Sequence, residues 1–504
     1  KKRKSGDGAA PPEEQSIPAR ADGLPSRVQY LLVGGGTASF AAMRAIRSAR
    51  PDAHVLIVSR EHALPYMRPP LSKELWREPD LADLAARPDA LSFRQWNGRR
   101  RSVLYEPAAF YTPPDRLRDG GPGAGVARGW RVTAVDPDAH TAHLESCLIA
   151  SGVRPRRLEA LREAAAAGRA FAVRELRDAA ALARRLDEPG ARTVAVVGGG
   201  LLAAELSAAL AERLRGAGGR VLQVYRESAP LAGLLPPYLA AHAARTLVAL
   251  GVTLVPRSEV VGGAVEGGRV RLTLAEGAPL EADVVVECVG SAPDEGLARR
   301  SRLETHAALG GLLVNGELQA RSDVWAAGDV ACFYDEALGR RRVEHHDHAV
   351  VSGRLAGENM AAVRAPRPYT HQSMFWSDLG QHLGYEAIGI IDSNLQTVGV
   401  FCEDAVHDAS EAGASGAGGG VALPETRALL AASAAAAAGA AAASAPGDEA
   451  TTKRYERGVV FYLRDQRVVG VLLWNLFNRM HVLARGEFDD LFEVAKLFSL
   501  QEED

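Results

Sequence analysis

The chain repeats one short plan: a buried strand, a run of glycines, a helix and a second strand. The two copies occupy residues 28–58 and 193–225. Their turns read Gly34-Gly35-Gly36-Thr37-Ala38-Ser39 and Gly198-Gly199-Gly200-Leu201-Leu202-Ala203. Glycines at these positions let the backbone approach a pyrophosphate, which the unpaired N–H groups of a helix N-terminus bind. One such turn is weak support, but two in the same setting predict two doubly wound nucleotide-binding domains.

The residues around each turn refine this prediction. In the G-x-G-x-x-G motif of dinucleotide-binding domains, the third glycine is replaced here by Ser39 in the first copy and by Ala203 in the second. Both residues are small, but the turns match the motif less closely. An acidic residue should follow the second strand to accept the ribose hydroxyls. Glu227 does so in the second copy and would repel a 2′-phosphate, which favours NADH over NADPH, although an arginine adjoins it. In the first copy Arg60 takes the position, so either the next residue, Glu61, reaches the ribose after a small backbone adjustment or the contact is lost.

Further segments are typical of an oxidoreductase with two dinucleotides. Cys147–Gly152 resembles the strand that closes an FAD domain, and Val286–Pro293 would end an NAD domain. Val324–Asp329 resembles a late G-D motif, in which Asp329 would bind the ribityl chain. These segments occur in the order that such a chain requires, which single chance matches would not produce.

The length of 504 residues predicts several domains. Four strand-like runs near the end, bounded by turn residues, predict an antiparallel sheet. They are Gln372–Trp376, Thr397–Phe401, Gly458–Leu463 and Val468–Trp474, the last two joined by a turn at residues 465–467. The expected parts are a disordered segment at 1–27, an FAD-binding domain at 28–155 and 291–370, an NAD-binding domain at 156–290, and a C-terminal domain at 371–504 with a mobile Ala- and Gly-rich insertion at 403–454.

Composition excludes several classes of protein. A net charge of −3 argues against a protein that mainly coats nucleic acid. The four cysteines, Cys147, Cys288, Cys332 and Cys402, form no C-x-x-C pair, which argues against a zinc ribbon, a disulfide scaffold and a dithiol redox centre. The chain begins KKRKSGDGAA, without an initiator methionine or an apolar signal core. We therefore expect a processed or trimmed form, from which any targeting segment would be missing.

A cluster of three histidines and two carboxylates occupies residues 344–348, before a predicted helix over 348–359. Metal binding is disfavoured because histidine spacings of one and three residues do not converge on an ion as i, i+4 histidines do. Another interpretation is that these residues cap the N-terminus of the predicted helix, a role that suits Asp347 and His348 better than His345.

Longer strings make a family resemblance specific. They are Leu64–Trp76, Phe93–Gly98, Gly339–Met360 and Gln372–Gly380. Over about residues 28–402 and 455–504 the chain resembles the apoptosis-inducing factor family. The resemblance implies an FAD-dependent NADH oxidoreductase of the α/β class with a glutathione-reductase-like fold: two doubly wound nucleotide-binding domains and an antiparallel C-terminal sheet domain.

The resemblance also implies site residues. FAD would be held by Gly34, Gly35, Gly36, Thr37, Ala38, Glu61, Arg68, Lys73, Val132, Arg174, Asp329, His345, His346 and Trp376. NADH would be held by Gly199, Gly200, Leu201, Leu202, Glu227, Gly290, Glu344, Glu386 and Asn478. The family pairs a lysine with a glutamate beside flavin N5, which match Lys73 and Glu205; with His345 these are the expected catalytic residues. A cation there would stabilise the negative charge that hydride brings to the flavin.

Three positions depart from the family pattern. Leu201 replaces a phenylalanine that gates the nicotinamide, and leucine cannot stack on the ring, so a weaker flavin–nicotinamide charge-transfer band is expected. Gly233 replaces a lysine near the NAD phosphates. Leu313 replaces an arginine of the dimer interface whose acidic partner is kept as Glu304, which puts dimerisation on NADH binding in doubt.

By resemblance, the chain would reside in the mitochondrial intermembrane space, with any membrane anchor outside this chain. There it would support respiratory-chain biogenesis together with an import oxidoreductase, and it would dimerise on reduction. In caspase-independent cell death it would pass through the cytosol to the nucleus and bind DNA without sequence preference. The 403–454 insertion would be released on reduction. Two rivals stay open: a plain reductase of a ferredoxin, rubredoxin or quinone, and a non-enzymatic flavoprotein that binds DNA or a partner.

Overall fold

A computed structural model of the chain describes residues 23–86, 91–95, 98–118, 121–136, 146–381, 383–401 and 455–476. Residues 1–22 of the expected N-terminal segment and the 403–454 insertion lie outside these ranges. The fold divides into two compact units, each described by itself below. Unit 1 holds the described residues up to Val194, with 262–272 and 280–373, and unit 2 holds 195–261, 273–279 and the described residues from Met374 on.

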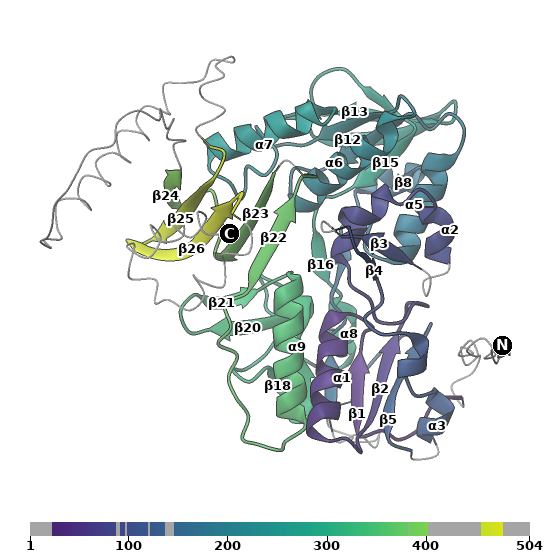
Figure 1. Cartoon of the computed structure of the whole chain (residues 1–504), viewed down its shortest axis with the longest axis vertical. Helices are drawn as coiled ribbons and strands as arrows, with labels where there is room; N and C mark the ends of the chain where they lie inside the picture. Colours follow the sequence, from purple (N-terminus) through teal and green to yellow (C-terminus); the bar gives the residue numbers. More distant parts are fainter. Residues whose placement is uncertain are drawn as a thin grey trace, which may run out of the picture. The chain divides into compact units, whose positions relative to one another are not determined.

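The first glycine turn lies in unit 1, at the centre of a six-stranded sheet of order β18-β19-β6-β1-β2-β5 (Figure 1). Its strands are β1 (Tyr30–Val33), β2 (His54–Ser59), β5 (Gly123–Arg128), β6 (Ser146–Ile149), β18 (Gln319–Arg321) and β19 (Val324–Ala326). All neighbours are parallel except β18 and β19, which are antiparallel. Tyr30 pairs with Val55 on one side and Ser146 on the other. The central strands are almost continuously apolar because both faces of a parallel sheet are covered.

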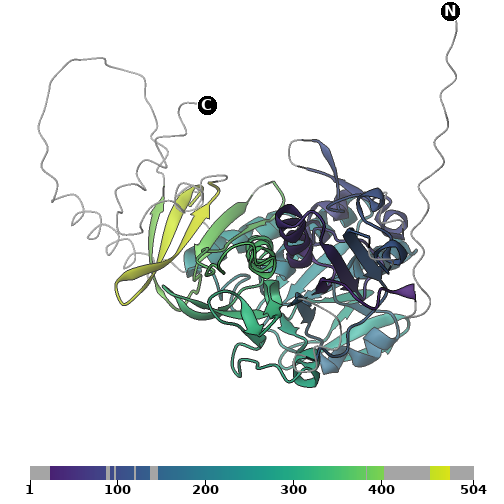
Figure 2. The same cartoon turned by 90° about the horizontal axis from the view of Figure 1, so that it is seen from below.

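Two helices of unit 1, α1 (Thr37–Ala49) and α9 (His346–Met360), lie side by side in Figures 1 and 2. Small residues allow this close approach. A Cβ on Gly357 would lie 2.8 Å from the Cα of Ala42, and real side chains do not come so close to backbone. The helix that follows the first glycine turn is therefore fixed by a helix far away in the sequence.

The other elements of unit 1 are mostly short. They are η2 (Pro69–Ser72), η3 (Glu74–Arg77), α2 (Leu81–Ala86), β3 (Ser92–Arg94), β4 (Arg100–Ser102), η5 (Ala108–Phe110), α3 (Pro114–Arg118), β7 (Val153–Pro155), η6 (Glu159–Leu161), α4 (Arg162–Ala166), β8 (Ala170–Phe171), α5 (Leu176–Asp187), β14 (Leu280–Ala282), β15 (Val284–Glu287), β16 (Ser291–Pro293), α8 (Glu295–Arg300), β17 (Leu312–Leu313), η7 (Gly328–Val330), β20 (Ala331–Asp335) and β21 (Gly339–Arg342). Strand β15 is parallel to β8, and β7 is antiparallel to β16. Strands β3 and β4 pair in antiparallel fashion, and Trp96 and Asn97 between them are outside the described residues.

The second glycine turn belongs to unit 2 and follows the same plan as the first. Strand β9 (Thr193–Val197) leads through the turn to α6 (Leu201–Arg215), then to β10 (Arg220–Val224), α7 (Pro237–Ala249) and β11 (Val252–Val255). The strand order is β11-β10-β9, and β10 and β11 are parallel. Strands β12 (Val260–Glu266) and β13 (Arg269–Leu274), most of whose residues belong to unit 1, form a three-stranded sheet with β14.

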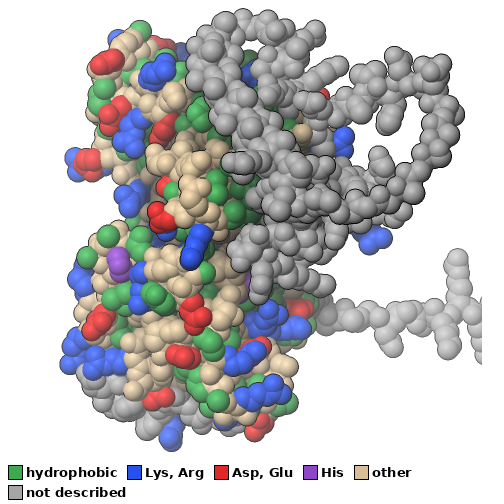
Figure 3. All heavy atoms as spheres, turned by 90° about the vertical axis from the view of Figure 1, so that its left-hand side faces the viewer, with side chains coloured by type: hydrophobic (Ala, Val, Ile, Leu, Met, Phe, Trp, Pro, Cys, Tyr) green, Lys and Arg blue, Asp and Glu red, His purple; other side chains and the backbone are tan. Residues whose placement is uncertain are grey.

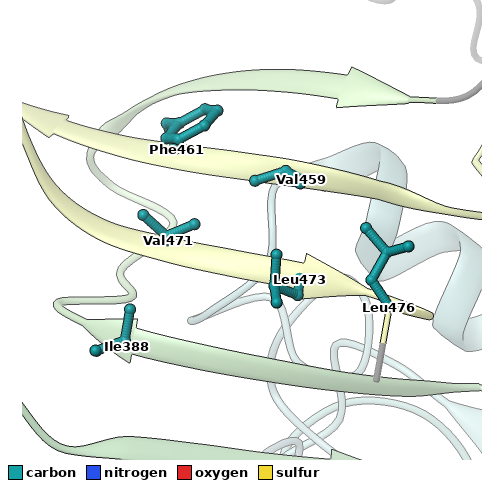
Figure 4. Close-up of a cluster of buried hydrophobic side chains, with 6 residues drawn as sticks. All are labelled: Ile388, Val459, Phe461, Val471, Leu473 and Leu476. Carbon is teal, nitrogen blue, oxygen red and sulfur yellow. The ribbon is translucent and has the colours of Figure 1, made fainter. Parts of the chain in front are cut away.

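Unit 2 also contains the predicted antiparallel sheet, in the order β22-β23-β26-β25-β24. Its strands are β22 (Met374–Asp378), β23 (Gly384–Gly389), β24 (Gln396–Phe401), β25 (Gly458–Arg464) and β26 (Arg467–Trp474). One face carries the apolar cluster in Figure 4: Ile388, Val459, Phe461, Val471, Leu473 and Leu476. The β25–β26 turn has two residues rather than the predicted three. Asp465 and Gln466 have φ of 50° and 63°, the left-handed geometry of a tight hairpin.

The visible surface agrees with the small net charge. Over the described residues in Figure 3, lysine and arginine side chains are interspersed with aspartate and glutamate side chains. None of the helices in the described ranges is long and apolar enough to cross a membrane.

Candidate cofactor-binding site

The first glycine turn is closed to side chains at two positions. Gly34 has φ of +117°, and its N–H donates to the Val58 carbonyl at 2.9 Å. A Cβ on Gly34 would lie 2.9 Å from the carbonyl carbon of Ala150, and one on Gly35 would lie 2.5 Å from Ser59 Oγ. Glycine is therefore required here by both conformation and space.

The third glycine, Gly36, opens the N-terminus of α1. It is the N-cap residue, no side chain caps the helix, and the first turn has no acidic residue. A Cβ on Gly36 would meet nothing within 4 Å. The free N–H groups and the positive end of a 13-residue helix thus face open space, which suits a phosphate anion. The residues present therefore fit a dinucleotide. The next side chain, Thr37, hydrogen-bonds through Oγ1 to the Tyr105 hydroxyl at 2.8 Å.

A buried network follows β2 in unit 1. Arg68 Nη2 donates to Glu61 Oε1 at 2.6 Å, and the Tyr66 hydroxyl donates to Glu61 Oε2 at 2.6 Å. Arg68 Nη1 donates to the Tyr66 hydroxyl at 2.9 Å. Burial alone raises the pKa of the Glu61 carboxyl, but Arg68 and Tyr66 outweigh it and the pKa is lowered. The carboxylate is therefore ionised and held in one orientation.

The same network extends to the late G-D motif. Arg68 Nη1 donates to the Arg174 carbonyl at 2.7 Å, and Arg174 Nη2 donates to Asp329 Oδ2 at 2.7 Å. Asp329 lies in η7, where the Gly328 N–H donates to Ser352 Oγ of α9 at 3.0 Å. Four of the residues predicted to hold FAD, namely Glu61, Arg68, Arg174 and Asp329, thus belong to one connected set.

The two neighbouring residues after β2 have different partners. Arg60 is ion-paired with Glu175, the N-cap residue of α5, whereas Glu61 is bonded to Arg68 and Tyr66. Burial and the nearby Glu61 raise the pKa of Glu175. Of the two, Glu61 is the one built into the network beside the first glycine turn.

The remaining predicted FAD residues of unit 1 are in separate settings. Lys73 is buried between η2 and η3, and Val132 is half-buried in an irregular stretch. His345 is the N-cap residue of α9 without a side-chain cap bond, and His346 is the first residue of the helix. Burial lowers the pKa of His345 to about 4 and also lowers that of His346. Both imidazoles are therefore neutral at pH 7.

The alternative interpretation, in which His348 caps the helix, is wrong, because the N-cap residue is His345. The helix begins two residues earlier than expected, and His348 points into the core, where it is 0% exposed. Its Nδ1 hydrogen-bonds to the Tyr369 hydroxyl at 2.7 Å, and its ring stacks on Phe333 at 5.0 Å between centroids. Burial, with His345 and Arg341 nearby, lowers its pKa to about 3. Within the described ranges no three His, Cys, Asp or Glu side chains are placed to hold a metal ion.

The second glycine turn has the same construction in unit 2. Gly198 has φ of +141°, its N–H donates to the Val224 carbonyl at 2.8 Å, and its carbonyl accepts from Gln223 Nε2 at 3.1 Å. Gly200 is the N-cap residue of α6, again without a side-chain cap or an acidic first turn. Leu201 and Leu202 begin the helix, and Leu202 is exposed. This 15-residue helix also offers its N-terminus to an anion.

The carboxylate of Glu227 lies over this second turn. A Cβ on Gly199 would be 2.7 Å from Glu227 Oε2, so the exposed carboxylate reaches back across the glycine. Gly233, where the family has a lysine, has open space around its Cα and accepts from the Ser393 N–H at 3.3 Å. An acid lies at this turn, and the chain has no lysine at position 233 to add a positive charge.

Strand β22 brings three relevant residues together in unit 2. Trp376 pairs with Glu386 of β23 in the sheet register. Trp376 is 38% exposed, whereas Ser377 beside it is buried on the opposite face. Ser377 Oγ donates to Oε1 of Glu205, a buried residue of α6, at 2.6 Å. The predicted catalytic Glu205 thus has a partner that the sequence did not indicate.

Two predicted NAD residues lie in unit 1. Gly290 has φ of +94° at the end of the segment after β15. Glu344 accepts from Arg342 Nη1 at 2.6 Å and from the Ser291 hydroxyl. Asn478 lies outside the described residues.

Comparison with known proteins decides the family. Residues 28–353 match the pyridine nucleotide-disulphide oxidoreductase family, and residues 356–487 match the C-terminal domain of mitochondrion-associated apoptosis-inducing factor. The chain is 42% identical to a Drosophila melanogaster protein described as a putative mitochondrial apoptosis-inducing factor 1, over 96% of this chain and 67% of that one. It is 32% identical to the Dictyostelium discoideum mitochondrial apoptosis-inducing factor 1, over 94% and 82%. The chain belongs to the apoptosis-inducing factor family.

Membership confirms the predicted fold class, enzyme class and cofactors. The chain is an FAD-dependent NAD(P)H oxidoreductase that uses FAD and NAD(H). A crystal structure of a covalent putidaredoxin reductase–putidaredoxin complex matches with a TM-score of 0.66 at 18% identity, over 95% of this chain and 99% of that one, which shows the shared fold. Although the broader family is named for disulphides, Cys147, Cys288 and Cys332 of this apoptosis-inducing factor homologue are free and buried.

Sequence reasoning missed two polar side chains of this family member. Tyr66 joins Glu61, Arg68 and the Leu176 N–H through its one hydroxyl, and Ser377 bonds to Glu205. Both lie inside strings that carry the family resemblance, at residues 64–76 and 372–380. That location was the available signal, but the partners are far away in the sequence.

Proposed function

We propose that the chain is specifically an NADH oxidoreductase whose FAD is held by unit 1 through the first glycine turn. The observation that carries the proposal is that both glycine turns end in a long helix with an uncapped N-terminus. Neither first turn has an acidic residue that would repel a phosphate. FAD, when bound, supplies the ring that accepts hydride from NADH.

The residues of unit 1 then have distinct tasks. Gly34, Gly35 and Gly36, with Thr37 and Ala38, receive the pyrophosphate, and Asp329 binds the ribityl chain. Arg68, oriented by Glu61 and Tyr66, supplies a fixed positive charge, with Arg174 beside it. Lys73 stabilises negative charge on the reduced ring, and the α9 N-terminus with His345 and His346 adds uncapped N–H groups. Val132 supplies apolar contact, and the family resemblance assigns the same task to Trp376, which belongs to unit 2.

NADH binding is assigned to the second turn. Gly199, Gly200, Leu201 and Leu202 receive its pyrophosphate, and Glu227 accepts the ribose hydroxyls. A 2′-phosphate would be repelled by the Glu227 carboxylate, so NADH is preferred over NADPH. Gly290, Glu344, Glu386 and Asn478 complete the proposed contacts, and Glu205 acts with Lys73 in catalysis.

A matched pair of substitutions tests these assignments. Gly36 and Gly200 both have ordinary φ values and empty space around the Cα, so an aspartate fits and caps the helix at either place. Gly36→Asp should fold and lose FAD, whereas Gly200→Asp should keep FAD and bind NADH about 10- to 100-fold more weakly, since charge-assisted contacts are replaced by repulsion. The Gly→Ala variants control for bulk. FAD bound to Gly36→Asp with unchanged affinity would contradict the proposal.

We further propose the cellular role that the family resemblance implies: a protein of the mitochondrial intermembrane space that supports respiratory-chain biogenesis with an import oxidoreductase, dimerises on reduction, and enters the nucleus through the cytosol in caspase-independent cell death. The support is the match of residues 356–487 and the two relatives described as mitochondrial. We also propose the domain boundaries given above, including release of 403–454.

Binding to DNA in the nucleus is a separate part of this proposal. If it occurs through phosphate contacts, the logarithm of the affinity should fall linearly with the logarithm of salt concentration and should not depend on sequence. A fluorescence-anisotropy titration with two unrelated duplexes measures both. Absence of binding at low salt would remove the nuclear part and leave the oxidoreductase assignment intact.

A further inference from the structure

We propose that Ser377 is a positioning residue for the carboxylate of Glu205. This inference rests on the proposed function, in which Glu205 is catalytic. Ser377 Oγ donates a short hydrogen bond of 2.6 Å to Glu205 Oε1. The bond joins β22 of the C-terminal sheet to α6, the helix that begins at the second glycine turn.

Both partners of this hydrogen bond are buried. Ser377 is 1% exposed and Glu205 is 7% exposed, so both partners are shielded from bulk water. A buried carboxylate that loses its donor has its orientation released. The hydroxyl therefore holds Oε1 of Glu205 in place.

The sheet fixes where the hydroxyl lies. Ser377 pairs with Tyr385 in the antiparallel register of β22 and β23, so its Cα cannot shift without disturbing the ladder. Alternation along the strand turns Ser377 into the protein and leaves the adjacent Trp376, a predicted FAD residue, on the opposite, exposed face. One strand thus carries a predicted cofactor contact on one face and the partner of the catalytic acid on the other.

The serine of α6 itself has a buried hydroxyl that does not bond to Glu205. Ser207 is two residues after Glu205 and 0% exposed, and its Oγ has no hydrogen-bond partner among the described residues. Replacing Ser207 by alanine removes a buried hydroxyl from the helix of Glu205 but leaves the hydrogen bond from Ser377 to Glu205 in place. It is the matched control.

The test is anaerobic rapid mixing of the FAD-loaded protein with a series of NADH concentrations, which separates the limiting rate of flavin bleaching from the NADH concentration that gives half of it. Ser377→Ala should slow the limiting rate roughly tenfold and leave the half-saturating NADH concentration unchanged, because the carboxylate loses the donor that fixes its orientation. Ser377→Thr, which keeps the hydroxyl, should restore the limiting rate. Ser207→Ala should match the wild type, with FAD content and thermal unfolding verified for every variant.

The Glu205→Gln variant separates the inference about Ser377 from the proposed catalytic role of Glu205. If Glu205→Gln is slow while Ser377→Ala matches the wild type in limiting rate, the inference about Ser377 is overturned and the role of Glu205 stands. If Glu205→Gln reduces as fast as the wild type, the catalytic role of Glu205 is overturned, and the inference falls with it. Should Ser377→Ala fail to fold, Ser377→Cys keeps the volume with a much weaker donor and takes its place.

Discussion

Gly353 of α9 lies directly against Ala38 of α1, so that a Cβ on Gly353 would be 2.7 Å from the Ala38 Cα. Ala38 is the second residue of α1, immediately after the first glycine turn. The helix N-terminus proposed to receive the FAD pyrophosphate is therefore held in place by a helix whose own first residues are His346 and Asp347. The backbones of α1 and α9 can come this close because Gly353 has no side chain.

Gly353→Ala should destabilise the protein and weaken FAD binding. Alanine would gain about 1 kcal/mol of helix propensity, but overpacking against rigid backbone costs about 1–3 kcal/mol or more, so the net effect is unfavourable. Chemical unfolding and FAD titration measure the two effects. Gly216→Ala, where a Cβ would meet nothing within 4 Å and the backbone is helical, is the control. Equal stability of both variants would contradict the packing argument.

Tyr66→Phe should loosen the network beside the first turn. The lost hydroxyl leaves Glu61, Arg68 and the Leu176 N–H each without one partner, which should lower the free energy of unfolding by about 1–3 kcal/mol and speed FAD release. Flavin fluorescence on dilution follows the release rate. Tyr334→Phe, at a residue that is exposed on β20, should change neither quantity. Unchanged FAD release from Tyr66→Phe would rule out the orienting role of this hydroxyl.

Stability should fall on acidification partly through His348. Its pKa is lowered from 6.5 to about 3 in the folded state, so below pH 6.5 the unfolded chain binds a proton that the folded chain does not. The free energy of unfolding therefore declines between about pH 6.5 and 3, by up to about 1.4 kcal/mol per pH unit from this group. His348→Gln should flatten that slope, and His62→Gln, at an exposed histidine, should not. Identical slopes for His348→Gln and the wild type would exclude this linkage.

Leu201→Phe should strengthen the long-wavelength charge-transfer band after anaerobic NADH addition. Leu201 is the first residue of α6 and half-buried, and an aromatic ring there can stack on the nicotinamide where leucine cannot. Val248→Phe, on the exposed side of α7, is the control for a new aromatic residue. A wild-type band that is already strong and persistent would contradict the expectation.

The nucleotide-binding halves could be predicted from the sequence because their signals are local. A short apolar strand, a glycine turn and a helix follow one another within each copy, and the structure has β1 with α1 and β9 with α6 there. Four of the five strands of the C-terminal sheet were also predicted, because turn residues bound them, whereas β23 (Gly384–Gly389) was not. The two-residue turn at Asp465 and Gln466 was missed because left-handed φ values at two non-glycine residues have no strong sequence signal.

The contacts that complete the site could not be predicted, because they join distant segments. Tyr66 bonds to Leu176, and Ser377 bonds to Glu205, across more than one hundred residues in each case. His348 was misread for the same reason. Its place in a polar string suggested a helix cap, whereas packing against Phe333 and Tyr369 makes it a core residue.

Anaerobic titration of the purified protein with NADH, followed by absorbance, measures whether this nucleotide reduces a bound flavin. We expect a yellow protein with one FAD per chain, whose flavin absorbance bleaches with NADH and bleaches less readily with NADPH, because of Glu227. A colourless protein that does not take up FAD, or an FAD-loaded protein that excess NADH leaves oxidised, would contradict this expectation.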